Sequence, residues 1–226
     1  MRLFFLPGLA CDERIFARQL AFFPEADVLL FHPEKNETLS ACAARIAEKV
    51  LAETENDAPC AVIGLSLGGM LAPFVAAKIG AKKCILISSV RGKNEFPRRW
   101  MPFHFLMKFC PPLAFLIVLA MKGSARLFRP ILHRCLGFAK REALTQFLDC
   151  TPKNFFRSAK MMFAWAFESS SPDRPFPDTF HIHGDKDSLI PPGCVRPDRV
   201  IPRAGHLLLL THAEELNEIL AEVLEW

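Results

Sequence analysis

Short apolar runs alternate with amphipathic stretches along most of the chain. Continuous runs rich in Val, Ile, Leu, Phe and Cys predict buried strands at residues 3–6, 28–31, 60–65, 84–87, 180–183 and 199–201. Apolar residues at helical spacing predict helices after Asp12 and after Thr38, over 67–79 and over 213–226. Apolar strands that alternate with amphipathic helices predict a parallel sheet covered by helices on both faces.

This alternation stops after Ser89 and resumes near Thr179. The residues between, 91–175, are Phe-rich, basic and interrupted by prolines, and their apolar spacing predicts helices. Thr151-Pro152 predicts a helix N-cap followed by proline at the first helical position, and we expect that helix to pack back on the sheet. The preceding part, 91–148, is therefore expected to form a helical cap.

The length and composition favour one folded domain over residues 1–226. With 51% apolar and 23% charged residues, the chain is not expected to be intrinsically disordered. Its eight cysteines include no Cys-x-x-Cys pair and no short metal-ligand spacing, which favours buried thiols in a reducing compartment. The apolar run at 3–6 is too short for a signal peptide, and the longest candidate membrane stretch, 113–121, falls short of the roughly 20 residues that a spanning helix needs. We therefore expect a cytoplasmic protein with no metal or other cofactor.

Positive charge is concentrated in the insertion. The net charge is +4, but residues 91–175 hold 15 Lys and Arg against 5 Asp and Glu, whereas the rest of the chain holds 13 against 19. This asymmetry predicts either a solvated face or a region that meets an anionic partner, such as an acyl carrier protein, CoA or a membrane surface. Nucleic acid is not expected, because the sequence contains no base-reading module and no basic-aromatic stripe. The basic residues of the expected cap are Arg98, Arg99, Arg126, Arg129, Arg134, Lys140 and Arg141.

The strongest chemical motif is Gly64-Leu65-Ser66-Leu67-Gly68-Gly69. It follows a predicted strand and precedes a predicted helix, which is the context of a nucleophile elbow. A sharp turn there exposes the hydroxyl of Ser66, and the small residues at positions 64 and 68 let strand and helix approach closely. The motif predicts that Ser66 is a nucleophile.

A serine hydroxyl needs a base, and the base in turn needs an acid that orients it. His206 lies just after the last predicted strand, in Ala204-Gly205-His206. Two carboxylates precede it at the end of another predicted strand: Asp187 is our choice for the acid, and Asp185 is the reserve candidate, with shaping of the turn as its alternative role. His181 and His183 alternate along that strand, and without a third ligand at suitable spacing we expect structural roles rather than a metal pair.

An acyl-transfer site also needs donors for the developing oxyanion. The backbone N–H of Leu67, directly after the nucleophile, is one candidate. The other is the N–H of Leu9, in the Pro7-Gly8-Leu9-Ala10 loop after the first strand.

With these motifs in this order, the chain resembles the α/β-hydrolase superfamily, and in particular small bacterial serine hydrolases that share a segment like Gly8–Phe16. The resemblance implies the α/β-hydrolase fold: a mostly parallel sheet of about six strands, helices on both faces and a helical cap insertion. In this superfamily the acid commonly lies in a Gly-x-x-Asp pattern followed by apolar residues and a proline. Gly184 and Pro191 match this pattern, so the resemblance selects Asp187 as the acid. Two departures stand out: Pro7 precedes Gly8 where the family usually has His, and the stretch 192–198 is too short for the usual crossover helix.

The expected function is hydrolysis of a carboxylic ester or thioester through an acyl-enzyme. The substrate pocket is expected above the carboxyl ends of the strands and under the cap, with Trp100, Phe103 and Phe105 among the apolar lining. Two alternatives stay open. One is a non-hydrolytic elimination on the same triad, as in the menaquinone-pathway members of the superfamily, which an arginine near Ser66 would favour. The other is a non-catalytic binding protein on a hydrolase fold.

Overall fold

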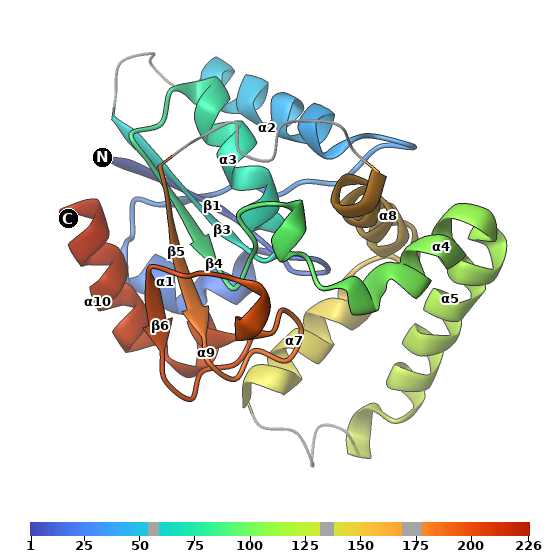
Figure 1. The fold of residues 1–226 in the computed structure, drawn as a ribbon. Coiled ribbons are helices and arrows are strands. Elements are labelled where there is room, and N and C mark those ends of the chain that lie inside the picture. The colour runs from blue at the N-terminus through green and yellow to red at the C-terminus, as the bar shows by residue number, and fades with distance from the viewer. Residues whose placement is uncertain (54–58, 132–137, 169–177) are drawn as a thin grey trace.

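The structure is a computed structural model that describes residues 1–53, 59–131, 138–168 and 178–226 (Figure 1). In this part of the chain, six strands form one sheet in the order β2-β1-β3-β4-β5-β6, and every neighbouring pair is parallel. The predicted parallel sheet is therefore confirmed. Its strands are β1 (Arg2–Leu6), β2 (Asp27–Val28), β3 (Cys60–Leu65), β4 (Lys83–Ile87), β5 (Thr179–Gly184) and β6 (Arg199–Ile201).

The central strands are apolar throughout because both of their faces are covered. All six residues of β3 are buried, and β3 pairs with β1 on one side and β4 on the other. The prediction was wrong for β2, which spans two residues rather than 28–31. The backbone N–H of Leu29 still donates to the carbonyl of Phe5, but Leu30 is 47% exposed, so the chain leaves the edge of the sheet there.

Helices cover the two faces of the sheet with separate cores (Figure 1). One core holds the side chains of α2 (Leu39–Glu53) and α3 (Leu67–Ile79), and the other holds those of α9 (Leu208–Thr211) and α10 (Ala213–Leu224). A short 3-10 turn (Glu13–Phe16) and α1 (Ala17–Phe22) pack on the second face.

The predicted helix ends are confirmed by their capping bonds. The Thr38 hydroxyl accepts from the N–H of Ala41 at 3.2 Å, at the start of α2. Gly80 ends α3 with a φ of +65°, a left-handed conformation that glycine adopts without strain. Asp12 accepts from the N–H of Arg14, but the element it caps is the 3-10 turn rather than α1 itself.

Four helices described between β4 and β5 make up most of the insertion: α4 (Met101–Phe109), α5 (Pro111–Leu127), α7 (Phe138–Asp149) and α8 (Pro152–Glu168). The Thr151 hydroxyl accepts from the N–H of Asn154 at 3.1 Å, which is the N-cap predicted for α8. Helix α8 contacts α2, α4 and α5, and its buried residues share a core with β1 and β3. Arg134 lies outside the described residues.

No single helix among the described segments is long and apolar enough to cross a membrane. By length and composition alone, the stretches Arg98–Phe109 and Pro111–Leu127 would pass that test together, but they meet at a bend of 118°.

Candidate active site

Ser66 lies on a strained turn between β3 and α3. Its φ of 51° and ψ of −115° are unusual for a residue with a side chain. The turn is tight because two glycines permit backbone contact: a Cβ on Gly64 would lie 2.3 Å from the carbonyl oxygen of Gly68, and one on Gly68 would lie 2.1 Å from that of Leu6. The Gly-x-Ser-x-Gly spacing therefore has a steric cause in this fold.

His206 reaches Ser66 from the loop after β6. Its Nε2 lies 3.0 Å from the Ser66 Oγ, and its Nδ1 lies 2.7 Å from the Oδ2 of Asp187. A carboxylate oxygen can only accept, so Nδ1 carries the proton that is donated to Asp187. In the neutral ring, Nε2 is then the acceptor for the Ser66 O–H. The fold thus joins the three predicted side chains in one hydrogen-bonded chain.

Asp187 is buried, and both of its carboxylate oxygens are engaged. Its Oδ1 accepts from the N–H groups of Leu189 at 2.8 Å and Ile190 at 3.0 Å, while Oδ2 accepts from His206. Burial acts to raise the pKa of Asp187, but the hydrogen bond and charge of His206 and the two amides outweigh it and lower that pKa. The partner of His206 is therefore Asp187 and not Asp185, the reserve candidate.

A close backbone contact holds the acid loop against the histidine loop. A Cβ on Gly184 would lie 2.2 Å from the carbonyl oxygen of Ala204, so only glycine fits at the end of β5. The N–H of Lys186 donates to that same carbonyl at 2.8 Å. These contacts bring Asp187 and His206 together even though the connection from β5 to β6 contains only a 3-10 turn, Pro192–Cys194.

His181 and His183 form a buried pair behind the acid. The Nε2 of His183 donates to the carbonyl of Ile190 at 2.9 Å and lies 3.4 Å from the Oδ2 of Asp187, while its Nδ1 lies 3.2 Å from the Nε2 of His181. Burial lowers the pKa of both rings, that of His181 to about 3. The pair is therefore neutral at pH 7 and supports the loop that holds Asp187. Within the described residues, no group of three or more His, Cys, Asp or Glu side chains could hold a metal ion.

The two predicted oxyanion donors lie on elements that flank Ser66. Leu67 is the first residue of α3, so its N–H has no acceptor inside the helix and lies at the positive end of the helix dipole. The loop that carries Leu9 passes directly beside the nucleophile, because a Cβ on Gly8 would lie 3.3 Å from the Cβ of Ser66. Both residues therefore lie in segments next to Ser66.

The three aromatic residues predicted for the pocket do not gather in one place. Trp100 and Phe103 are half-buried against the core shared with α8, and the Trp100 Nε1 donates to the carbonyl of Leu189 at 3.3 Å. Phe105 is 48% exposed and stacks on Phe109 at 6.0 Å, so its placement in the pocket lining was wrong. The reason is its position on α4, where His104 and Met107 face inward and Phe105 faces outward.

A cavity of about 470 Å³ lies beside the loop after β1. The loop after β2, the end of α7 and the start of α8 form its other walls, so it lies near the carboxyl ends of β1 and β2, and its lining residues do not include Ser66, Asp187 or His206. Its lining is more polar than predicted. It consists of Ala10, Cys11, Asp12, Leu30, His32, Pro33, Glu34, Gln146, Asp149, Cys150, Thr151, Lys153, Asn154 and Arg157.

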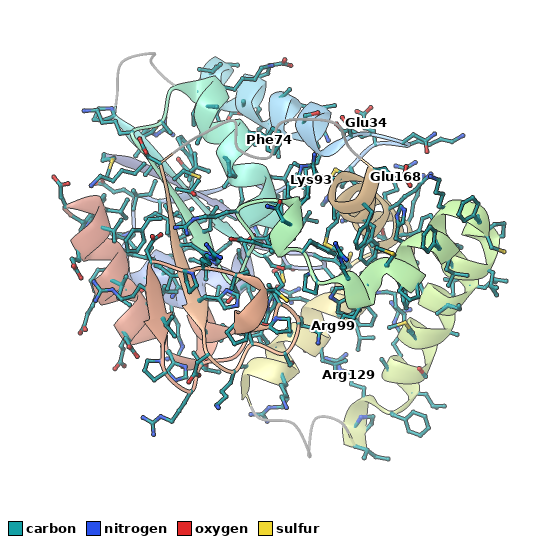
Figure 2. The ribbon with its side chains drawn as sticks, in the orientation of Figure 1. Glu34, Phe74, Lys93, Arg99, Arg129 and Glu168 are labelled. Carbon is teal, nitrogen blue, oxygen red and sulfur yellow. The ribbon has the colours of Figure 1, made fainter. Side chains whose placement is uncertain are left out.

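Two residues that support this site were not predicted. The Ser89 hydroxyl donates to the carbonyl of Ser66 at 2.7 Å and so holds the strained turn from the segment that follows β4. Arg99 donates to the carbonyls of Ser188 and Leu189, and thereby ties the start of the insertion to the acid loop (Figure 2). In the sequence, this role of Ser89 was indicated only by its position: it is a serine that comes shortly after β4, and β4 neighbours the strand that leads to Ser66. Nothing in the sequence indicated the partners of Arg99.

A comparison with models of known families shows which family this chain belongs to. The model of the alpha/beta hydrolase family matches residues 4–219. The chain belongs to the alpha/beta hydrolase family. No curated protein sequence matches this hydrolase-family chain.

Solved structures share the fold of this alpha/beta hydrolase at low sequence identity. A hydrolase from Pseudomonas aeruginosa PA01 superposes with a TM-score of 0.72 at 15% identity, covering 99% of this chain and 89% of its own. MenH from S. aureus gives 0.66 at 16% identity, with coverages of 100% and 93%. A thermophilic esterase from Thermogutta terrifontis gives 0.64 at 21% identity, with coverages of 100% and 89%. At identities this low, the similarity shows the fold alone. The substrate has to be inferred from the site itself.

Proposed function

We propose that this protein is a serine hydrolase that cleaves a carboxylic ester or thioester. The observation that carries the proposal is the chain of hydrogen bonds from Asp187 through His206 to Ser66, with Ser66 on a strained turn. Strain of this kind persists only where the surroundings enforce it, and it presents the hydroxyl to a substrate.

In the proposed mechanism, the Ser66 Oγ attacks the carbonyl carbon of the substrate while His206 Nε2 accepts the hydroxyl proton. Asp187 keeps the imidazole oriented and stabilises the imidazolium that forms. The N–H groups of Leu9 and Leu67 donate to the oxyanion. Collapse of this intermediate breaks the bond to the leaving alcohol or thiol, which takes the proton from His206. Water, deprotonated by His206, then attacks the acyl-enzyme, and the bond to Ser66 Oγ breaks as His206 returns the proton to that oxygen, which releases the acid.

The neutral His181–His183 pair suits this mechanism. A positive charge there would compete with His206 for Asp187 and would weaken the stabilisation of the imidazolium. Because burial keeps both rings uncharged, neither ring adds a second cation beside Asp187 to the one that forms on His206 during catalysis.

The cavity beside the loop after β1 favours a substrate with a polar portion. Its polar walls include Lys153, Asn154 and Arg157 from α8. These groups can donate hydrogen bonds to hydroxyl, amide or carboxylate groups of a bound molecule. The esterase from Thermogutta terrifontis among the structural neighbours is consistent with ester hydrolysis.

The elimination alternative would be favoured by an arginine that binds a carboxylate beside Ser66. Arg99 reaches the acid loop from the insertion, but its guanidinium donates to the backbone carbonyls of Ser188 and Leu189. No contact of Arg99 therefore favours elimination over hydrolysis.

The proposal is tested with purified protein on p-nitrophenyl esters and the matching acyl thioesters, from short to long acyl chains. Ser66→Ala should lower kcat by about a thousandfold or more, because it removes the nucleophile. Ser124→Ala is the matched control, since Ser124 is an exposed serine on α5 whose hydroxyl donates to the carbonyl of Met121 in the same helix. Equal turnover by Ser66→Ala and by the wild type would overturn the proposal.

A further inference from the structure

The outward side of α4 and α5 is apolar, which is the reverse of an ordinary surface helix. On α5, Ala114, Val118 and Lys122 face inward at four-residue spacing. On the opposite side, Leu113, Leu116 and Leu127 are 47%, 59% and 75% exposed. We call the exposed apolar residues of this stretch the α4–α5 outer face. They are Phe105, Phe109, Leu113, Leu116, Leu119, Met121, Leu127, Phe128 and Ile131.

This face is exceptional within the molecule. It contains nine of the sixteen large hydrophobic residues that are exposed in the described part of the chain, within a stretch of 27 residues (105–131). Scattered exposed apolar residues are normal, whereas a contiguous group marks a contact with a partner or a membrane. Helices α4 and α5 lie at the edge of the molecule, away from the sheet, so the face is open to the outside (Figure 1).

Among Lys, Arg, Asp and Glu, the same segment contains only the positively charged residues. Residues 98–131 contain six Lys and Arg and no Asp or Glu. Arg98, Lys108, Arg126 and Arg129 are all exposed, and Arg129 lies two residues beyond the end of α5 (Figure 2). Lys108 pairs with Glu168 of α8 at 3.1 Å, whereas Arg126 donates to the backbone carbonyl of Leu148, an acceptor without a net charge. Cations thus border exposed leucine and phenylalanine side chains.

We propose that the α4–α5 outer face docks this protein on the surface of an anionic lipid bilayer. Its leucines and phenylalanines would enter the boundary between headgroups and acyl chains, while the flanking arginines and lysines contact lipid phosphates. The protein then lies on the membrane without spanning it, in agreement with the 118° bend between the two helices. The inference is independent of the reaction proposed at Ser66.

Two other occupants fit the observations less well. A second copy of the chain would form a symmetric contact in which the same cations meet one another, and like charges at an interface oppose association. An acidic carrier protein would satisfy the arginines and lysines, but it gives no reason for nine exposed apolar side chains between them. An anionic bilayer satisfies both the charge and the apolar surface.

The test is co-sedimentation of the intact protein with vesicles of two compositions, phosphatidylcholine alone and phosphatidylcholine with about one third phosphatidylglycerol. We expect binding to the anionic vesicles that weakens as salt is added, because screening shortens the reach of the charges. Failure to bind these vesicles at low salt would overturn the proposal, and so would equal binding to the neutral ones.

Two variants separate the apolar and charged contributions. The triple variant Leu113→Ser, Leu116→Ser, Leu127→Ser should lower the partition coefficient by about tenfold or more, because it removes the inserting side chains. Arg129→Glu should lower it by about tenfold, because it replaces an attractive charge by a repulsive one. The matched controls, Leu51→Ser and Lys49→Glu, change exposed residues of α2 and should leave it unchanged.

The variants also distinguish the other occupants. Circular dichroism melting curves establish that each variant is folded before its binding is compared. A wild type that dimerises in solution, with loss of the dimer in the leucine variant and no vesicle binding, would overturn the proposal in favour of a second copy. Binding that depends on Arg129 but not on the leucines would overturn insertion and favour an acidic partner protein.

Discussion

Replacing Gly68 by alanine tests how the fold positions Ser66. Gly68 is the second residue of α3, and a Cβ there would lie 2.1 Å from the carbonyl oxygen of Leu6 and 2.6 Å from that of Pro7. Because an ordinary contact needs at least 3.4 Å, α3 and the end of β1 would have to separate by about 1.3 Å, the difference between 3.4 and 2.1. Both obstructing atoms belong to backbone, so no side chain can rotate away.

We expect two measurable effects of Gly68→Ala. Overpacking typically lowers the free energy of unfolding by about 1–3 kcal/mol. Because the clash here is with backbone atoms, we expect a decrease near the upper end of that range, about 3 kcal/mol. The shift also moves the Leu9 loop relative to Ser66, and a misplacement of about 1 Å at a reacting centre costs about a hundredfold in rate. On the proposed function, kcat for an ester substrate should therefore fall by about that factor.

Urea unfolding and ester turnover measure these effects separately. The matched control is Gly123→Ala, because Gly123 lies inside α5 and a Cβ there would meet nothing within 4 Å. Alanine is the better helix former by about 1 kcal/mol, so this variant should be as stable as the wild type or more stable. A Gly68→Ala protein with wild-type unfolding energy would refute the steric argument. If it is destabilised but keeps the wild-type kcat, the link from Gly68 to the oxyanion loop is refuted.

Three further predictions concern the surroundings of Ser66. Asp187→Asn should lower kcat by about 10³–10⁴-fold in the ester assay, because an amide no longer fixes the imidazole tautomer, whereas Asp185→Asn should change it by less than about threefold. Since the pKa of buried His181 is about 3 against an ordinary 6.5, the unfolded state binds more protons between these values. Stability should therefore fall as the pH drops below about 6.5, by up to about 1.4 kcal/mol per pH unit from this group, and urea unfolding of His181→Gln should show a weaker pH dependence. Ser89→Ala should lower the unfolding free energy by about 1–2 kcal/mol and slow turnover, because the carbonyl of strained Ser66 loses its bond; unchanged values would contradict that support.

The sheet and its flanking helices could be predicted well from the sequence, because the residue patterns that specify them are local. The strand at 60–65 and the helices that start after Thr38 and Ser66 depend on continuous apolar residues, a cap and a glycine turn, all of which act within a few residues. The prediction of a strand over 28–31 was wrong because the end of that strand depends on pairing with a neighbouring strand and not on local sequence. Its apolar residues look like a strand, but the edge of the sheet offers pairing only as far as Leu29.

The site was predictable to the extent that it depends on motifs. Ser66, Asp187 and His206 each follow a strand at the same edge of a parallel sheet, so their order and positions indicated a common site. What could not be predicted depends on tertiary contacts. The Arg99 contact spans about ninety residues of sequence, and whether Phe105 faces inward or outward is fixed by the rotation of α4 on α8.

The most direct test of the central claim is labelling by a fluorophosphonate, followed by intact mass spectrometry and peptide mapping. Such a probe forms a covalent bond with a serine only where a base activates its hydroxyl. The account predicts one adduct per chain, on Ser66, and no adduct on Ser66→Ala or on a protein unfolded in urea. A folded wild-type protein that remains unlabelled, or that carries the adduct on another residue, would contradict the assignment of Ser66 as the activated nucleophile.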